Sequence, residues 1–316
     1  MDMVIVLGSG NSGAGAVHDF LLSREDFQSP FNGKEFRLVN DPDGIDELYC
    51  SFYDNFSVNG CANKINNFLT FTNNYYFSNY NKKNKILNKS FIKLSKEFIK
   101  NISYIEYNGS PQFFFDKISF LKKINFYFKR FILNKNSKEI ELIKMIMPCS
   151  RNQFLYYSEN YIKKIFRSNY NFDEKKNIVI EQGGNFLNPI SSTKYYGKQR
   201  KIIVVTRNPK AIYWSMKRRN SLSYPGNDVK IFVKWYKEFI TKINKEEFRD
   251  VINIKFENFF ENFETETKIL SNKLNIDINI KKIFNLDYTL KNLYKYKDNL
   301  SSEEISYIDN NLNEYY

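Results

Sequence analysis

The sequence predicts an α/β fold, a three-layer sandwich in which a central parallel sheet lies between two layers of helices. Three observations predict it. Short apolar runs recur along the chain, each ends in turn-forming residues, and stretches with apolar residues at helical spacing lie between them. The chain has 316 residues, 42% of them hydrophobic, which is enough to bury one sizeable core. We therefore expect a single domain, 1–316, with one large insertion.

The elements follow in order along the chain. Apolar runs predict buried strands at residues 3–7, 35–39, 177–184, 201–209 and 251–259. Helical spacing predicts helices at residues 14–23, 211–219, 228–243 and 263–276. The alternation stops at residues 60 to about 170, which contain glycine only at Gly60 and Gly109 and have long stretches with helical spacing. This part is predicted to be a mostly helical insertion.

Composition limits the function classes. The formal net charge of +13 suits anionic ligands, while the absence of a run of five like charges argues against a nucleic-acid tail. Three cysteines without a C-x-x-C pair and a single histidine argue against a zinc site, so we expect no metal. We find no leader and no apolar segment of ~20 residues. The sequence thus predicts a cytoplasmic protein with no transmembrane segment, for which peripheral membrane contact stays open.

A glycine-rich loop, GSGNSGAG at residues 8–15, joins the first predicted strand to the first predicted helix. Such a strand–loop–helix binds phosphate through backbone N–H groups and the helix N-terminus. Ala14 and Gly15 stand where an ATPase loop needs Lys and Ser or Thr, which excludes hydrolysis of magnesium-bound ATP. Gly8, Gly10 and Gly13 match a dinucleotide-binding fingerprint, and Asp41 lies near the end of the second predicted strand, where that fingerprint wants an acid.

A second motif, VVTRNPKAIYWSMKRR, occupies residues 204–219. Arg207 ends a predicted strand, Pro209 suits the first turn of the following helix, and Ser215 lies about two turns into it. A guanidinium group can hold a phosphate through two parallel hydrogen bonds, and a serine hydroxyl can add another donor. The pattern therefore predicts a second phosphate contact.

These residues resemble the motifs of the sulfotransferases that use 3′-phosphoadenosine 5′-phosphosulfate (PAPS), in particular a bacterial carbohydrate-type branch. Arg207, Asn208, Pro209 and Ser215 match the 3′-phosphate motif R-[DN]-P-x-x-x-x-x-S, and Ser12 with Gly13 matches part of the 5′-phosphosulfate loop. Residues 256–259, FENF, resemble a late strand motif, and residues 294–312 resemble a terminal segment. The resemblance covers residues 4–39 and about 175–316.

The resemblance implies transfer of a sulfuryl group from PAPS, as a co-substrate without a metal, to a hydroxyl or amine of an acceptor. From the composition, the absence of a leader and the helical insertion, we expect that acceptor to be a glycan or glycolipid precursor. The insertion would form a lid on the acceptor side. Glu257 is expected to hold loop N–H groups at the carboxyl edge of the sheet. The residues implied to bind the nucleotide are Gly8, Ser9, Gly10, Asn11, Ser12, Gly13, Ala14, Gly15, Arg207 and Ser215.

Three residues are implied in the chemistry. Glu35 begins the second predicted strand, where related enzymes place a glutamate base, and His18 is the rival base. Asn11 stands where the family usually has Lys or Arg to serve the bridging oxygen, and it can donate a hydrogen bond but no charge. Two alternatives stay open at this point: an NAD-type oxidoreductase and a non-catalytic nucleotide-binding relative.

Overall fold

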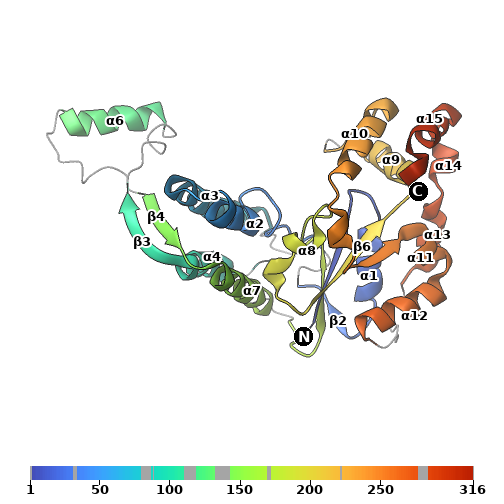
Figure 1. Ribbon diagram of the computed structural model, residues 1–316, viewed down its shortest axis with the longest axis horizontal. Helices are drawn as coiled ribbons and strands as arrows, with labels where there is room; N and C mark the ends of the chain where they lie inside the picture. Colours follow the sequence, from blue (N-terminus) through green and yellow to red (C-terminus); the bar gives the residue numbers. More distant parts are fainter. Residues whose placement is uncertain are drawn as a thin grey trace. The chain divides into compact units, whose positions relative to one another are not determined.

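The computed structural model describes residues 2–30, 34–79, 87, 89–109, 119–131, 143–168, 172–220, 223–276 and 284–315 (Figure 1). The chain divides into two compact units. One unit comprises Met1–Val39 and Tyr170–Tyr316, and the other comprises Asn40–Asn169. Within the described residues, no helix is both long enough and apolar enough to cross a bilayer.

The first unit is built on a five-stranded sheet in the order β2-β5-β1-β6-β7, in which every neighbouring pair is parallel. The strands are β1 (Met3–Gly8), β2 (Phe27–Gln28), β5 (Asn177–Glu181), β6 (Arg200–Thr206) and β7 (Ile252–Lys255). Since parallel strands end at the same edge, Gly8, Glu181, Thr206 and Lys255 gather at one carboxyl edge.

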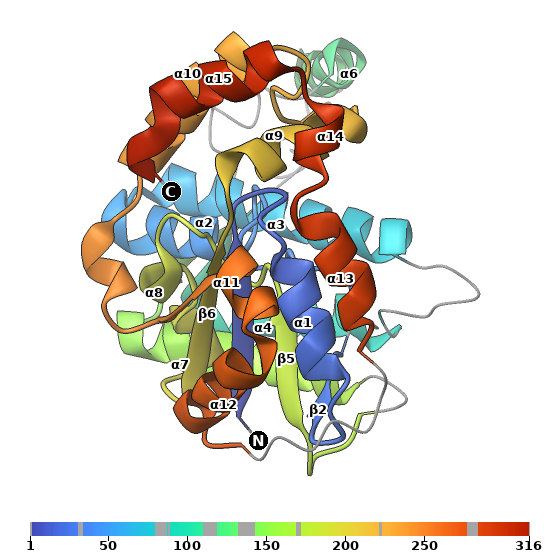
Figure 2. The same ribbon diagram turned by 90° about the vertical axis from the view of Figure 1, so that its right-hand side faces the viewer.

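One face of the sheet is covered by four helices, which Figure 2 shows: α1 (Ala14–Leu22), α11 (Phe256–Glu261), α12 (Phe263–Leu274) and α13 (Leu286–Leu293). Val4, Val6 and Val205 point to this face and share a core with them. Side chains alternate along a strand, so Ile5 points to the other face. The segment that contains α8 (Pro189–Ser192) and Tyr196 packs on that face. The side chain of Ile5 and the hydroxyl of Tyr196 both lie near Gly183. The predicted α/β class with a central parallel sheet flanked by helices is confirmed.

A separate helical cluster in the same unit follows β6. It consists of α9 (Pro209–Arg218), α10 (Val229–Thr241), α14 (Tyr296–Asn299) and α15 (Ser302–Leu312). Their shared core includes Trp214, Phe232 and Ile308. Ser301 begins α15 with a capping box, in which its hydroxyl accepts from Glu304 N and the Glu304 carboxylate accepts from Ser301 N.

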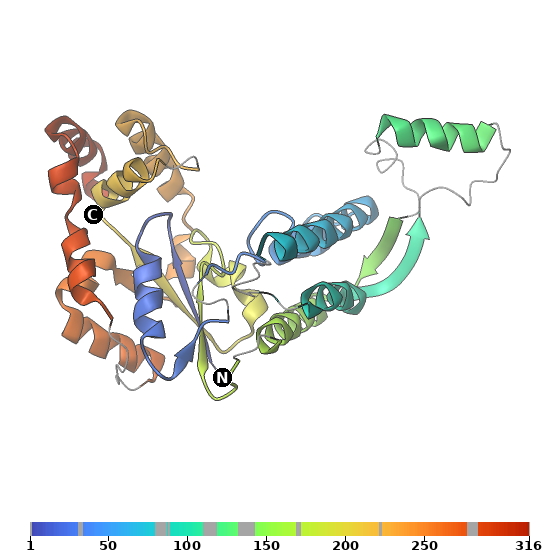
Figure 3. The same cartoon turned by 180° about the vertical axis from the view of Figure 1, so that it is seen from behind.

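The second unit is mostly helical in its described part, as predicted. Its elements are α2 (Ile45–Tyr49), a π-helical turn (Cys50–Asp54), α3 (Val58–Asn79), α4 (Ser90–Ile102), β3 (Ser103–Gly109), α6 (Phe120–Phe131), β4 (Ile143–Pro148) and α7 (Arg151–Arg167). Helices α4 and α7 pack through stacked rings of Phe98 and Tyr161, whose centroids lie 4.6 Å apart. The antiparallel pair β3–β4 was not predicted (Figure 3).

Two predicted strands were wrong in whole or in part. Residues 35–39 form no strand, because β2 occupies the place beside β5 and Phe36 meets only the end of β5, where its N–H donates to Glu181 O at 3.1 Å. The strand predicted at 251–259 ends at Lys255. Phe256, Phe259 and Phe260 then bury one side of a short helix, since they follow helical spacing.

Candidate functional site

The loop between β1 and α1 takes a left-handed backbone conformation at two positions. Asn11 has φ 67° and Gly13 has φ 90°. Asn tolerates this conformation better than most residues, which gives a local reason for an asparagine at position 11. At Gly13 a Cβ would also lie 2.3 Å from the ring of Phe256, so no larger residue fits there. The loop is thus shaped by its own backbone and by a helix more than 240 residues later in the sequence.

The loop presents hydrogen-bond donors that have no protein acceptor. Among the described residues, nothing accepts from the N–H groups of Gly13, Ala14 and Gly15, which open helix α1. The hydroxyl of Ser12 is buried and likewise has no partner there. The aligned peptide dipoles make the same helix end partly positive. Together, these groups are suited to an anion such as a phosphate.

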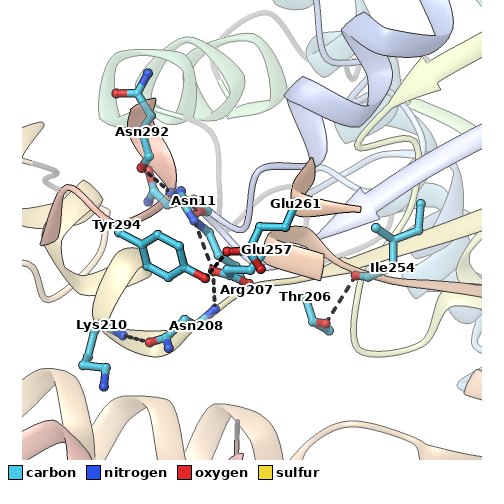
Figure 4. A network of polar contacts seen from close by, with 10 residues as sticks. All are labelled: Asn11, Thr206, Arg207, Asn208, Lys210, Ile254, Glu257, Glu261, Asn292 and Tyr294. Atoms are coloured by element: carbon cyan, nitrogen blue, oxygen red, sulfur yellow. Dashed lines mark hydrogen bonds and ion pairs between the residues drawn. The ribbon is translucent and has the colours of Figure 1, made fainter. Parts of the chain in front are cut away.

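Arg207 lies at the end of β6 with its side chain only 9% exposed. Its Nη1 donates to Asn11 O at 3.3 Å, and its Nη2 donates to Asn292 O at 3.4 Å (Figure 4). The guanidinium carbon lies 4.6 Å from the centre of the Phe256 ring. Nε is buried without a hydrogen-bond partner among the described residues, so its N–H is a donor available to a ligand.

Burial lowers the pKa of Arg207 because it disfavours the charged form, and the nearby carboxylate of Glu257 opposes that effect. Glu257 Oε1 lies 3.9 Å from Arg207 Nε and accepts from Asn208 N at 3.1 Å. The predicted role of Glu257 as a holder of loop N–H groups is therefore confirmed. It fixes the turn between β6 and α9 and compensates the buried cation.

Helix α9 begins as its sequence predicts. Asn208 is the N-cap, with Oδ1 accepting from Lys210 N at 2.9 Å, and Pro209 is the first helical residue. Two turns later, the buried Ser215 donates through Oγ to Asn11 Oδ1 at 3.2 Å. The glycine loop, the Arg207–Ser215 motif and the FENF segment therefore meet at one place, at Asn11, Arg207 and Phe256.

The two predicted bases differ in accessibility. Glu35 is exposed and lies on irregular backbone, not at the start of a strand. His18 is completely buried in α1, and neither ring nitrogen has a hydrogen-bond partner among the described residues, although Nδ1 lies 3.5 Å from Asp19 Oδ1. The position of Glu35 was therefore mispredicted, and the imidazole of His18 cannot reach a substrate in this conformation.

Sequence reasoning missed a third group, Glu181, the last residue of β5. Its carboxylate lies against the first turn of α1, where a Cβ on Gly15 would be 2.9 Å from Glu181 Oε1. Burial raises the pKa of Glu181, the charge of His18 opposes this, and the charges of Glu35 and Asp19 add to it. The sequence feature that could have indicated Glu181 is the apolar strand NIVIE, which ends in an acid at the carboxyl edge of the sheet.

The remaining predicted residues divide between the two units. Gly8 ends β1, and Ser9 and Gly10 follow it into the loop, where the ring of Tyr224 lies against Gly10. Asp41 does not end a strand of the sheet; it lies in a turn of the second unit, so the acid required by a dinucleotide fingerprint is not supplied as predicted. In the part of the chain that the structure describes, no group of three or more His, Cys, Asp or Glu side chains could hold a metal ion.

No protein-family model matches this chain, and no curated protein matches it. Among solved structures, it is similar to the sulfotransferase domain from the olefin synthase of Synechococcus PCC 7002, with 11% sequence identity and a TM-score of 0.40. The alignment covers 88% of this chain and 74% of that one.

Proposed function

We propose that this protein is a sulfotransferase that moves a sulfuryl group from PAPS to a hydroxyl or amine of an acceptor. One observation carries the proposal: Arg207 and Ser215, about 200 residues after the glycine loop, both contact Asn11 within that loop. A nucleotide with phosphates at its 5′ and 3′ positions needs two anion sites close together. The convergence of these motifs supports such a pair.

The donors of the site fit this nucleotide. The N–H groups of Gly13, Ala14 and Gly15, with the Ser12 hydroxyl, would hold the 5′-phosphosulfate at the positive end of α1. Arg207 and Ser215 would hold the 3′-phosphate, with Arg207 Nε, which has no hydrogen-bond partner among the described residues, as one donor. PAPS supplies the activated sulfuryl group, and no metal is required for its transfer in this proposal.

Glu181 is the best-placed proton acceptor. In the transfer, the acceptor oxygen or nitrogen forms a bond to sulfur, and the bond from sulfur to the bridging phosphate oxygen breaks. The acceptor proton goes to a carboxylate, and 3′-phosphoadenosine 5′-phosphate (PAP) leaves. Glu181 stands at the carboxyl edge beside the loop, and its raised pKa makes the carboxylate a stronger base than an ordinary glutamate. Glu35, which interacts electrostatically with it, is the second candidate.

The leaving oxygen lacks an adjacent cation from the loop itself. Asn11 can donate an amide N–H in its place, and its Oδ1 is already bonded to Ser215. Lys34 and Arg37 are exposed near Glu35 in sequence, while Arg151 belongs to the other unit and pairs with Asp54 at 3.2 Å. A non-catalytic nucleotide-binding protein is therefore the alternative, and turnover separates it from an enzyme.

The proposed acceptor is a glycan or glycolipid precursor that is modified in the cytoplasm. The helical insertion at about 60–170 is proposed as a lid on the acceptor side.

Isothermal titration with PAP, 5′-AMP and NAD⁺ tests the nucleotide assignment. We expect saturable binding of PAP that is tighter than binding of AMP, and no binding of NAD⁺ at the same concentration. Absence of PAP binding at millimolar concentration, or a preference for NAD⁺, would overturn it. Release of PAP from PAPS in the presence of an acceptor mixture then distinguishes the enzyme from a binding protein.

A further inference from the structure

Helix α6, Phe120–Phe131, lies in the connection between β3 and β4 (Figure 3). Several of its large apolar side chains are exposed. Phe120 and Leu121 are 75% and 77% exposed, and Ile124 and Phe128 are each 48% exposed. A folded protein in water seldom leaves several neighbouring apolar side chains of this size uncovered without an interaction to make.

These side chains form one stripe. Residues four apart lie above one another on a helix, so Phe120, Ile124 and Phe128 follow a single row, with Leu121 beside it. The stripe runs along most of the helix, which is 12 residues and therefore about 18 Å long. That length is well short of the ~30 Å hydrocarbon core of a bilayer, so the helix suits a surface and not a span.

The charged residues in the sequence around α6 are all positive. Residues 117–138 contain no Asp or Glu, and they contain seven basic residues, namely Lys117, Lys122, Lys123, Lys129, Arg130, Lys135 and Lys138. The whole chain has a net charge of +13. A second copy of this chain would bring the same positive charge to the contact, which opposes association. An anionic lipid surface complements that charge.

We propose that α6 is a docking surface for a bilayer that contains anionic phospholipids. The helix lies in the membrane plane, its Phe120–Phe128 stripe enters the boundary between headgroups and acyl chains, and the positive charge of the sequence around the helix favours anionic headgroups. Aromatic side chains suit that boundary because their rings are apolar and polarisable. This inference does not depend on the nucleotide or on sulfuryl transfer.

Co-sedimentation of the full chain with sucrose-loaded vesicles tests the proposal. One vesicle preparation is pure phosphatidylcholine, and the other contains 30 mol% (about one lipid in three) phosphatidylglycerol. We expect binding to the anionic vesicles that is at least about tenfold stronger than binding to the neutral ones and that weakens with added salt. No binding to either preparation, or equal binding to both, would overturn the proposal.

Variants locate the surface. Leu121→Asp with Phe128→Asp should weaken binding to the anionic vesicles by about tenfold or more. The matched control, Phe77→Asp with Tyr156→Asp, changes the charge equally at exposed rings of α3 and α7, which are 65% and 62% exposed, and should bind like the parent. Circular dichroism should be the same for all three proteins. Equal loss in both double variants would overturn the assignment to α6.

Two further measurements test the insertion of α6 into the bilayer and the self-association of the chain. The chain has two tryptophans, both in the first unit, so Phe120→Trp should add emission that shifts to shorter wavelength with anionic vesicles beyond any shift of the parent. An unchanged spectrum contradicts insertion of the helix. Light scattering should give a monomer, and a dimer that the Leu121→Asp/Phe128→Asp variant abolishes would assign the stripe to a second copy instead.

Discussion

Replacing Arg207 by Gln should weaken the binding of PAP much more than the binding of 5′-AMP, because only PAP carries a 3′-phosphate. The Arg207 side chain is 9% exposed, and its Nε has no hydrogen-bond partner in the described part of the chain, so a contact of the guanidinium with phosphate would be shielded from water. A charge-assisted hydrogen bond of this kind contributes about 1.5–3 kcal/mol, which corresponds to about 10- to 150-fold in Kd.

Arg207→Gln should weaken the binding of 5′-AMP by no more than about fivefold. Arg207 also donates to Asn11 O at 3.3 Å, a long hydrogen bond from a cation to a neutral carbonyl, and its loss should affect the shape of the loop by only about 1 kcal/mol. Arg207→Lys should fall between Arg and Gln for PAP, because it keeps the charge and loses the paired donors. Both affinities are measurable by titration calorimetry, with the thermal midpoint recorded for each variant.

Arg218→Gln is the matched control. Arg218 is the last residue of α9, is exposed, and stacks on Trp214 at 4.9 Å, so its loss should change PAP affinity by no more than about fivefold. Equal weakening of PAP and AMP by Arg207→Gln would show that Arg207 only shapes the loop. An unchanged affinity for PAP would remove Arg207 from the site.

Three further predictions concern the loop and its carboxylates. Glu181→Gln should lower turnover by about 10²–10⁴-fold with PAP affinity retained, whereas Glu35→Gln should change turnover little, and the reverse result would make Glu35 the base. Since the pKa of Glu181 is raised in the folded chain, protonation favours folding below its unfolded pKa and that contribution is lost as pH rises. The unfolding free energy of Glu181→Gln minus that of the parent should therefore increase with pH in urea titrations, and a pH-independent difference would contradict the shift. Gly8→Ala should cost about 1–3 kcal/mol of stability, because its Cβ would lie 2.0 Å from Ser12 Oγ, and adding Ser12→Ala should recover most of that loss in a double-mutant cycle.

The sequence by itself determined the α/β class, the parallel strands β1, β5 and β6, and the helices that follow β1 and β6. Each of these elements is set by local features: a continuous apolar run, helical spacing, or a turn such as Asn208-Pro209 that begins a helix. The same local chemistry marked Arg207 and Ser215 as phosphate contacts, which remains a prediction.

Only the tertiary structure decided which residues meet. Residues 35–39 have an apolar pattern typical of a strand, but Phe27–Gln28 pairs with β5 instead, and pairing partners are not encoded by local periodicity. Glu181 is a candidate base because the end of β5 lies against Gly15, 166 residues earlier in the chain. Burial there and the charges of Glu35 and Asp19 raise the pKa of Glu181. The ring of His18 on α1 is inaccessible because it is buried. Burial depends on the packing of the core and not on the helix that carries the residue.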